Sequence, residues 1–567
     1  MTNHSWQGVY PEGVDWDLKF APKAIPDLLD EAAATAGERT LIDFLGRRFS
    51  FNELRDLSDR TAKGLQALGI GPDTRVGLFM PNVPQYIPSL MGTLKTGATA
   101  VNLSPLLAPR ELAYLIEDSG TEIIITMDLK LLYNRIPALL AETGLRKVIV
   151  CRMQDVLPFP KNRLFALAKR KEIAKFPLDE QHMRFEDLVA NDGKYRTVKI
   201  DPLSTVALLQ YTGGTTGTPK GAMLSHAAIT AADAMYEAWG HQFEDASGLQ
   251  RKVMLVLPLF HIFGLSVVLL GAIRQRSEIL LYPRPDIELL LRDIARKKAT
   301  ILPGVPTLFT AIASHPKAPT TDFSSLSYCA SGGAPLPTEV QEKFEAVTGI
   351  KIYEGYGLTE TSPAATGQVR ANEYRTGSCG VPLPGTTIEI RDIENARKKM
   401  KIGEIGEICI KGPQLMLGYW NQPDETKGAL RGGWLHTGDT GYLDEDGYLF
   451  IVDRMKDLII SSGYNVYPRH VEDAIYQHKS VEEVTVIGVP DEYKGEAAKA
   501  FIKLRAGSEL SHEALIAFLG ERLAKYELPV ETEFRDELPK TPVGKLSKKE
   551  LVAEERAKRE AAKAAAG

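Results

Sequence analysis

The feature that most constrains the fold is a short apolar strand that runs directly into a loop of glycines, threonines and one lysine. Residues 205–212 read TVALLQYT, and residues 213–221 continue as GGTTGTPKG. Glycines let successive backbone N–H groups point into one concavity, and such concavities bind phosphate oxygens. Threonine hydroxyls, the charge of Lys220 and the positive end of a helix expected near Ser225 would strengthen this attraction. A flexible turn is the alternative, but the residue pattern favours a phosphate site.

The common P-loop motif is a poor match for this loop. That motif places a glycine directly before its lysine, whereas Lys220 follows Pro219. We therefore expect a phosphate-binding loop of another kind, which begins where a strand ends.

Helix-like and strand-like segments alternate along most of the chain. Residues 51–69 carry apolar side chains at helical spacing and stop at a glycine, and residues 74–81 read as a short buried strand. Residues 83–101 read as a helix followed by a strand, and the alternation resumes from residue 201 to residue 365. This order predicts an α/β fold with a mostly parallel sheet and helices packed on it.

The last third of the chain has a different pattern. Between residues 376 and 455, short strand-like segments are separated by Gly and Asp turns, which is typical of a small antiparallel sheet or barrel. A new α+β segment begins after Arg454 and ends in a helix rich in Lys, Glu and Ala. Because 567 residues are too many for one hydrophobic core, we expect a large domain at 1–454 and a small one at 455–567.

Composition excludes several classes of protein. The net charge of −5 argues against a generic nucleic-acid binder. The four cysteines form no CxxC pair and the histidines do not cluster, which argues against a disulfide framework or a structural zinc site and fits a reduced, cytoplasmic setting. The first residues lack the basic and apolar regions of a signal peptide.

The longest apolar stretch, 253–273, contains a proline, a histidine and two glycines, so we expect a buried strand, a loop and a core helix.

A basic segment at residues 157–176 leaves two interpretations open. It reads LPFPKNRLFALAKRKEIAKF and mixes basic residues with Leu and Phe. One interpretation is an amphipathic surface helix that touches anionic lipid, at the inner face of a membrane. The other is a solvated basic helix between subdomains.

Several motifs in a fixed order resemble those of the adenylate-forming superfamily. The loop YTGGTTGTPKGAMLSH (211–226) is similar to the signature loop of that group, which includes acyl-CoA synthetases, adenylation domains of peptide synthetases, and luciferases. Further stretches that resemble family motifs follow in the family's order: LPLFHIFG (257–264), ASGGAPL (330–336), YEGYGLTETSP (353–363), residues 433–468 and LPKTPVGKLSKKEL (538–551). The sequences of residues 453–468 and of the basic segment at 157–176 most resemble those of bacterial long-chain fatty acid–CoA ligases.

The resemblance implies a fold and a two-step reaction. The fold would be a large N-terminal domain of stacked α/β subdomains plus a small β-barrel-like subdomain, followed by a small mobile C-terminal domain. A carboxylate would attack the α-phosphorus of ATP to give acyl-AMP and pyrophosphate, and the thiol of coenzyme A would then displace AMP. ATP, Mg²⁺, coenzyme A and a fatty acid are therefore the expected small-molecule partners, and a homodimer follows by analogy alone.

The resemblance also assigns the nucleotide to individual residues. Glu360 would be the magnesium ligand, since a hard cation prefers oxygen, and Asp439 would accept hydrogen bonds from the ribose hydroxyls. The other ATP-binding residues implied are Thr212, Gly213, Gly214, Thr215, Thr216, Gly217, Lys220, Gly332, Gly333, Ala334, Pro335, Glu354, Gly355, Tyr356, Gly357, Thr359 and Arg454.

The small domain would supply the remaining catalytic parts. Lys545 would reach the carboxylate and the α-phosphate, and it is implied as a catalytic residue together with Glu360, Thr212 and His261. Lys456 falls at the family's hinge, and Gly463 would line the channel for the pantetheine arm of coenzyme A.

The stretch LFHIFG carries no acidic residue that could pair with the ammonium group of an amino acid, so an apolar acid is expected. By position in the family, the wall of the acyl pocket would include His261, Leu265, Val305, Thr307 and Leu308. Leu265 stands nearest the gating tryptophan of some long-chain enzymes, which leaves the preferred chain length open.

Three alternatives remain open. The chain could be a fatty acyl-AMP ligase that loads a carrier protein, or a CoA ligase for medium-chain or aryl acids. It could also be a binding protein without catalysis that kept the fold.

Overall fold

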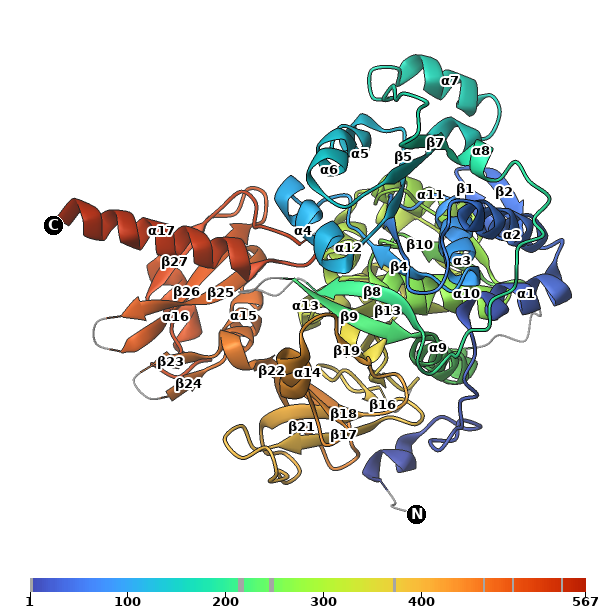
Figure 1. Ribbon diagram of the computed structural model, residues 1–567. Coiled ribbons are helices and arrows are strands. Elements are labelled where there is room, and N and C mark those ends of the chain that lie inside the picture. The colour runs from blue at the N-terminus through green and yellow to red at the C-terminus, as the bar shows by residue number, and fades with distance from the viewer. Residues whose placement is uncertain are drawn as a thin grey trace.

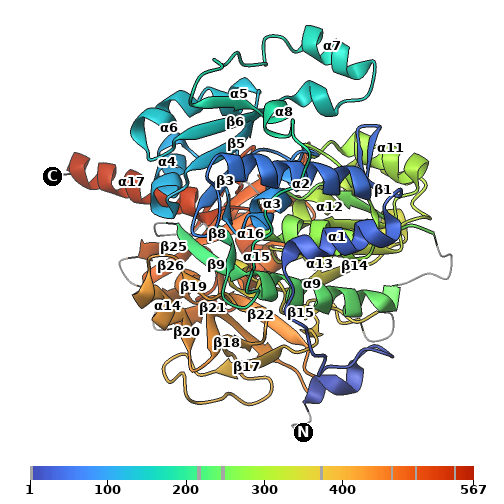
Figure 2. The same ribbon diagram turned by 45° about the vertical axis from the view of Figure 1, so that its right-hand side comes forward.

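The computed structural model describes residues 4–212, 219–243, 249–370, 374–461, 464–491, 494–541 and 544–566. Three groups of elements are visible (Figure 1): two large sheets with helices in the upper and central part, a small antiparallel sheet below, and a C-terminal α+β unit at one side. Both views place the long C-terminal helix at the outer edge of that unit (Figure 2).

The first large sheet has eight strands and includes β8, the strand that precedes the glycine and threonine loop at 213–221. Its order is β19 (Gly418–Tyr419), β9 (Lys220–Ser225), β8 (Val206–Thr212), β4 (Thr99–Asn102), β3 (Arg75–Phe79), β5 (Ile123–Met127), β6 (Lys147–Cys151) and β7 (His182–Arg184). The strands from β8 to β7 are parallel, whereas β9 is antiparallel to β8 and β19 is antiparallel to β9.

The second large sheet has seven strands. Its order is β14 (Ile352–Gly355), β13 (Tyr328–Gly332), β12 (Ile301–Gly304), β10 (Lys252–Leu255), β11 (Glu278–Leu281), β1 (Thr40–Phe44) and β2 (Arg47–Ser50). All neighbours are parallel except β1 and β2. The predicted mostly parallel α/β fold is therefore confirmed.

Helices cover both sheets and share one hydrophobic core with them. The helices of this part are α1 (Ile25–Ala36), α2 (Phe51–Ala67), α3 (Tyr86–Lys95), α4 (Pro109–Ser119), α5 (Lys130–Tyr133), α6 (Ile136–Glu142), α7 (Lys161–Ala168), α8 (Phe185–Leu188), α9 (His226–Gly240), α10 (Gly271–Arg274), α11 (Ile287–Lys297), α12 (Pro306–Ser314) and α13 (Thr338–Thr348). Every residue of α3 is buried, because it packs inside this core rather than on its surface. The helices and strands expected within residues 51–69, 74–81 and 83–101 are all present.

The long apolar stretch at 253–273 forms β10, a turn and a buried π-helix, η4 (Phe263–Leu270), which continues into α10. The expected strand, loop and core helix are confirmed. Across the described ranges, each helix is either too short or too polar to span a lipid bilayer.

One prediction about the phosphate loop is wrong. Helix α9 does begin after Ser225, whose hydroxyl accepts a hydrogen bond from Ala228 N at 3.1 Å. However, β9 separates the helix from the loop: Lys220 pairs with Thr212, and Ser225 pairs with Val206 at the other end of the hairpin. Five residues of strand span roughly 17 Å, so the positive end of α9 does not reach the loop.

The expected small antiparallel sheet is also present. It contains β17 (Thr387–Arg391), β18 (Gly406–Lys411), β21 (Trp434–Leu443), β20 (Leu430–Arg431) and β22 (Leu449–Arg454), all paired antiparallel. Short helix α14 (Pro423–Ala429) lies between β19 and β20 in the chain. The pairing of β21 with β22 sets Asp439 opposite Arg454.

The C-terminal unit begins just after this sheet. Its strands and helices are β23 (Ile459–Ser461), β24 (Tyr464–Val466), α15 (Pro468–Tyr476), β25 (Val481–Asp491), β26 (Gly495–Leu504), α16 (His512–Leu519), β27 (Glu531–Phe534) and α17 (Lys548–Ala566). Two hydrophobic clusters belong wholly to this unit, one spanning Ile459 to Leu523 and one including Phe501, Leu538 and Leu551. Residues beyond Ile459 therefore have cores of their own.

Candidate active site

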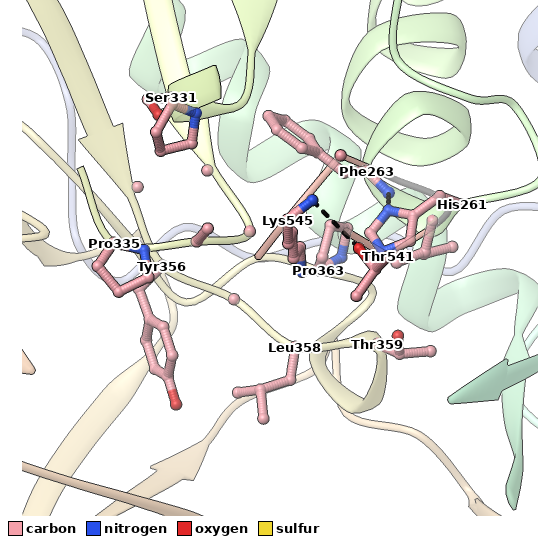
Figure 3. A pocket seen from close by; sticks show the side chains of 18 of the residues that line it. His261, Phe263, Ser331, Pro335, Tyr356, Leu358, Thr359, Pro363, Thr541 and Lys545 are labelled. Atoms are coloured by element: carbon pink, nitrogen blue, oxygen red, sulfur yellow. Dashed lines mark hydrogen bonds between the residues drawn. The ribbon is translucent and has the colours of Figure 1, made fainter. Parts of the chain in front are cut away.

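A cavity of about 1320 Å³ lies where the two large sheets, the small sheet and the C-terminal unit meet. Strands β13 and β14 end here with Gly332 paired to Gly355, and β8 ends here at Thr212. Ligands of open α/β sheets bind beyond the carboxyl ends of the strands, which is where this cavity lies. Figure 3 shows side chains from several of these elements reaching into it.

The structure brings most of the sequence-predicted site residues to this one cavity. Those that line it are Thr212, Lys220, His261, Gly332, Gly333, Ala334, Pro335, Glu354, Gly355, Tyr356, Gly357, Thr359, Glu360, Asp439, Arg454, Lys456 and Lys545. Gly213, Gly214, Thr215, Thr216, Gly217 and Gly463 lie outside the described residues.

Asp439 is a buried carboxylate held by several neighbours. It is 4% exposed, and its Oδ1 lies 3.0 Å from the guanidinium Nε of Arg454. The hydroxyl of Tyr356 donates a hydrogen bond of 2.6 Å to Oδ2, and Thr437 accepts one of 3.1 Å from the Asp439 backbone. These contacts hold the carboxylate at the cavity wall beside an aromatic ring, which suits a ligand with hydroxyls next to a flat base.

Glu360 and Lys220 are held together by a segment that sequence reasoning missed. The hydroxyl of Tyr419 donates a 2.7 Å hydrogen bond to Glu360 Oε1. Lys220 forms an ion pair with Glu425, and its ammonium lies 5.3 Å from the centre of the Tyr419 ring. No motif marks Tyr419 or Glu425, because their roles come from the pairing of β19 with β9.

Lys545 enters the cavity from the C-terminal unit. Its backbone N–H donates to Thr541 Oγ1 at 3.1 Å, and the preceding Gly544 accepts a 3.0 Å hydrogen bond from Thr307 of α12. Burial, together with the nearby charge of Arg454, lowers the pKa of Lys545 to about 8. Figure 3 shows Lys545 and His261 directed into the same space.

His261 is a neutral imidazole at ordinary pH. Burial lowers its pKa to about 3, and the charge of Lys545 acts in the same direction. Its Nδ1 lies 3.3 Å from the backbone N–H of Phe263, so that nitrogen accepts. This geometry fits a residue that shapes the cavity rather than one that takes up protons.

Apolar side chains of α9, η4 and β13 form one part of the cavity wall, which we call the acyl channel. Its wall includes Tyr236, Trp239, Phe243, Val267, Val268, Ala272 and Tyr328. Phe263, Val267 and Gly271 line the cavity at intervals of four residues, so one face of η4 and α10 forms the wall.

Of the expected acyl-pocket residues, His261 and Thr307 line the cavity and three others do not. Leu265, Val305 and Leu308 are buried but do not line the cavity. Leu265 lies two positions from the lining residues of η4 and therefore packs on the opposite face. On α12 the lining positions are Pro306, Thr307 and Thr310, and the neighbouring leucine and valine pack into the core.

The chain matches the family model of AMP-binding enzymes over residues 29–420. A second model, the AMP-binding enzyme C-terminal domain, matches residues 470–545. This chain belongs to the AMP-binding enzyme family.

Relatives of this AMP-binding enzyme match it over almost its full length. The long-chain-fatty-acid–CoA ligase of Bacillus subtilis is 39% identical over 562 residues, which is 97% of this chain and 98% of the relative. The ligase of the same name from Salmonella typhimurium is 37% identical over 561 residues, 98% of each chain. Among solved structures, ATP-bound MatB from Rhodopseudomonas palustris is 28% identical, with a TM-score of 0.80 over 93% of this chain and 98% of that one.

In this AMP-binding enzyme, Glu354 braces the turn that follows β13. Its carboxylate accepts a 3.2 Å hydrogen bond from Leu336 N, which fixes the turn that contains Gly332–Pro335. Burial raises the pKa of Glu354 to about 7. Glu354 therefore acts on the loop, although it also lines the cavity.

Lys456 stands where the small sheet passes into the C-terminal unit. It lies in a single turn, η8 (Met455–Asp457), between β22 and β23. Burial and the charge of Arg454 lower its pKa. The position suits a hinge, since the turn joins groups of elements with separate cores.

A buried group of three possible metal ligands lies beside Asp439 in space. Glu407, Cys409 and His436 of β18 and β21 have ligand atoms within 4.8 Å of one another, although they are not clustered in the sequence. The pair Glu407 Oε2 and His436 Nδ1 lies at 2.6 Å, a direct hydrogen bond. Glu407 Oε1 also accepts from Gly438 N at 3.3 Å, so the group braces the turn before Asp439.

Proposed function

We propose that this AMP-binding enzyme is an ATP-dependent fatty acid–CoA ligase. It joins a fatty acid to ATP, releases pyrophosphate, and transfers the acyl group from acyl-AMP to coenzyme A. One observation carries the proposal: Lys545, Asp439 and Glu360 line the same cavity as a group of aromatic and aliphatic side chains. The named relatives support the same activity over nearly the whole chain.

The chain's own residues supply positioning and charge for the first step. The attacking carboxylate and the α-phosphate are both anions, and they repel each other unless a cation lies between them. Lys545 provides that cation in a buried place where charge interactions are stronger than in water. Asp439 and Tyr356 would hold the nucleoside end in the same cavity that Lys545 enters.

Glu360 is the residue that fits a magnesium ion. It offers a carboxylate, the ligand type that a hard cation prefers, and the hydrogen bond from Tyr419 fixes its orientation. When bound, magnesium would neutralise part of the charge of the ATP phosphates. Thr212, Lys220, Thr359 and the loop glycines complete the proposed phosphate site.

The channel favours an apolar acid. Its wall is built from aromatic and aliphatic side chains, among them Trp239, Val267 and Tyr328. Each buried methylene contributes about 0.8 kcal/mol, so a long chain gains considerable affinity from such a wall.

We propose further that residues 1–454 and 455–567 act as two domains that turn against each other at Lys456. With Lys545 in the cavity, the arrangement suits formation of acyl-AMP. Thioester formation would need Lys545 withdrawn and the face around Gly463 presented instead.

The decisive experiment is pyrophosphate exchange into ATP with a panel of fatty acids from C6 to C18, followed by AMP release with coenzyme A. We expect pyrophosphate exchange that depends on the acid. We expect AMP release that depends on both the acid and coenzyme A. Exchange without transfer to coenzyme A would favour the carrier-protein alternative, and a preference for aryl acids would favour that class. Absence of exchange with every acid overturns the proposal.

We also propose that the basic segment at 157–176 contacts an anionic membrane surface. Phe159, Leu164 and Leu167 are 75%, 57% and 76% exposed, and α7 projects from the edge of the molecule in both views (Figure 1, Figure 2). The cations of the segment are Lys161, Arg163, Lys169, Arg170, Lys171 and Lys175. Apolar side chains beside cations are typical of surfaces that enter lipid headgroups.

Cosedimentation with phosphatidylglycerol and phosphatidylcholine vesicles tests this contact. Binding to the anionic vesicles should be lost when Leu164 and Leu167 are both replaced by Asp. The control Leu203→Asp, at another site that is 60% exposed, should bind like the parent protein. Equal loss of vesicle binding in the control contradicts the assignment.

A homodimer stays a prediction by analogy, and sedimentation equilibrium tests it.

A further inference from the structure

A short segment, β19–α14 (Gly418–Ala429), contacts both of the residues expected to handle the phosphates of ATP. Its Tyr419 donates a hydrogen bond to Glu360, and its Glu425 forms an ion pair with Lys220. Tyr419 belongs to β19 and Glu425 to α14, which follow each other in the chain, so the two contacts are parts of one local structure.

The backbone of this segment is firmly attached to the phosphate-loop hairpin. Tyr419 lies opposite Ala222 in the pairing of β19 with β9, and Trp420 N donates to Gly221 O at 2.8 Å. Tyr419 N also donates to Thr426 Oγ1 at 2.8 Å, which ties the strand to the first turns of α14. Glu425 is therefore presented to Lys220 by a helix whose preceding strand, β19, belongs to the same sheet as β9.

The ion pair places a carboxylate on the ammonium group that the proposed function gives to a phosphate. Lys220 is one-third exposed and Glu425 more than half exposed at the mouth of the cavity, so the pair can open without unfolding its surroundings. The Tyr419 ring beneath the ammonium keeps Lys220 in place whichever anion it contacts.

We propose that Glu425 is a positioning residue that competes with the ATP phosphates for Lys220. Without nucleotide it holds Lys220 beside Tyr419 at the site entrance. ATP binding exchanges the carboxylate for phosphate oxygens, and departure of pyrophosphate restores the pair. This inference rests on the proposed role of Lys220 in binding ATP.

Replacement of Glu425 by Gln tests the competition through binding alone. Isothermal titration with Mg-ATP and with pyrophosphate should give dissociation constants about 1.4- to fivefold lower for E425Q, since exposed ion pairs are worth roughly 0.2–1 kcal/mol. Adenosine, which has no phosphate, should bind both proteins equally. In turnover, the KM for ATP should fall while kcat does not rise, because pyrophosphate also leaves more slowly.

Asp424→Asn is the matched control for the change of charge. Asp424 is the preceding residue of α14, its side chain is 96% exposed, and it pairs with Lys427 at 3.7 Å. A general electrostatic effect would tighten ATP binding equally in D424N and E425Q, and that result overturns the proposal. Unchanged or weaker ATP binding in E425Q, or a matching change for adenosine, also overturns it.

The titrations test the competition for Lys220 independently of the proposed ligase activity. They need no fatty acid, so a protein without acid-dependent exchange can still show the predicted difference for ATP. Raising the salt concentration should shrink the difference between E425Q and the parent protein, because the pair is exposed and screened by ions. A difference that does not change with salt contradicts competition by charge.

Discussion

Lys545 of the C-terminal unit lies directly against Gly333 of the turn that follows β13. A Cβ atom placed on Gly333 would lie 3.0 Å from Lys545 Cε and 3.2 Å from Nζ. Gly333 also has a φ of +81°, a conformation that side chains rarely adopt. The lack of a side chain at Gly333 therefore lets the end of the Lys545 side chain lie against this turn at the cavity wall.

Gly333→Ala should displace Lys545 and lower the rate of adenylation by tenfold or more. Gly349→Ala is the control, because Gly349 has a similar φ of +74° but no atom within 4 Å of the added methyl. Both variants should lose roughly 1–2 kcal/mol of stability from the same backbone strain. Thermal unfolding and pyrophosphate exchange measure the two effects separately, and similar exchange rates in both variants would show that the contact is unimportant.

Lys545→Ala should lower adenylation by roughly 10²–10³-fold, the usual effect of losing one preplaced group that stabilises developing charge. Thioester formation from supplied acyl-AMP and coenzyme A should be nearly unchanged, because Lys545 is then withdrawn. The exposed Lys525 offers a control substitution in the same unit. If both half-reactions fail equally, the two-domain alternation is wrong for this protein.

Adenylation should decline as the pH rises through about 8. Burial and Arg454 lower the pKa of Lys545 to about 8, so its ammonium is charged below that pH and neutral above it. The profile of kcat/KM for pyrophosphate exchange reports ionisations of the free enzyme. In Lys545→Arg the guanidinium stays charged, so the alkaline decline should move upward in pH. A decline at the same pH in that variant would assign it to another group.

Local sequence patterns were sufficient where an element's own residues decide its structure. Helix α2 shows why: Ser50 Oγ accepts from Glu53 N at 3.1 Å, and the Glu53 carboxylate accepts from Ser50 N at 2.6 Å. The sequence contains the Ser-x-x-Glu pattern that predicts these capping contacts, and apolar residues at helical spacing follow it. The alternation of strands and helices likewise predicted parallel sheets, because crossover helices leave a regular pattern.

Features that depend on pairing across the chain could not be predicted. Strand β9 looks like a continuation of the phosphate loop, and only its pairing with β8 shows that α9 starts far from Lys220. Tyr419 and Glu425 reach the site because β19 joins β9, which no local pattern indicates. The family resemblance predicts Asp439 and Arg454 at the site, and both line the cavity. Leu265, expected at the acyl pocket, does not line it, whereas Val267 of the same helix does.

Val267→Phe should shorten the acyl channel and change the preference for chain length. Val267 is partly exposed to the channel, so a larger side chain there occupies space that a long acyl chain would need. We expect exchange with C16 acid to fall at least tenfold more than exchange with C8 acid, since each excluded methylene is worth about 1–3 kcal/mol. Val267→Ile is the conservative control, and retained C8 activity shows that the variant folds. An equal loss for both acids would place the chain elsewhere.

The hydrogen-bonding of Asp439 to ribose can be tested with a cycle of substrate and protein changes. Asp439→Asn removes the charge that faces Arg454 and weakens acceptance from hydroxyl groups, and kcat/KM for ATP should fall roughly 10–100-fold. In the parent protein, 2′-deoxy-ATP and 3′-deoxy-ATP should each be poorer substrates than ATP. In D439N most of this discrimination should vanish. If Asp439 contacts the ribose hydroxyls, removing the hydroxyl and changing the carboxylate disrupt the same interaction, so their free-energy effects do not add. If both deoxynucleotides remain equally disfavoured in D439N, the carboxylate orients Tyr356 and Arg454 without touching the sugar.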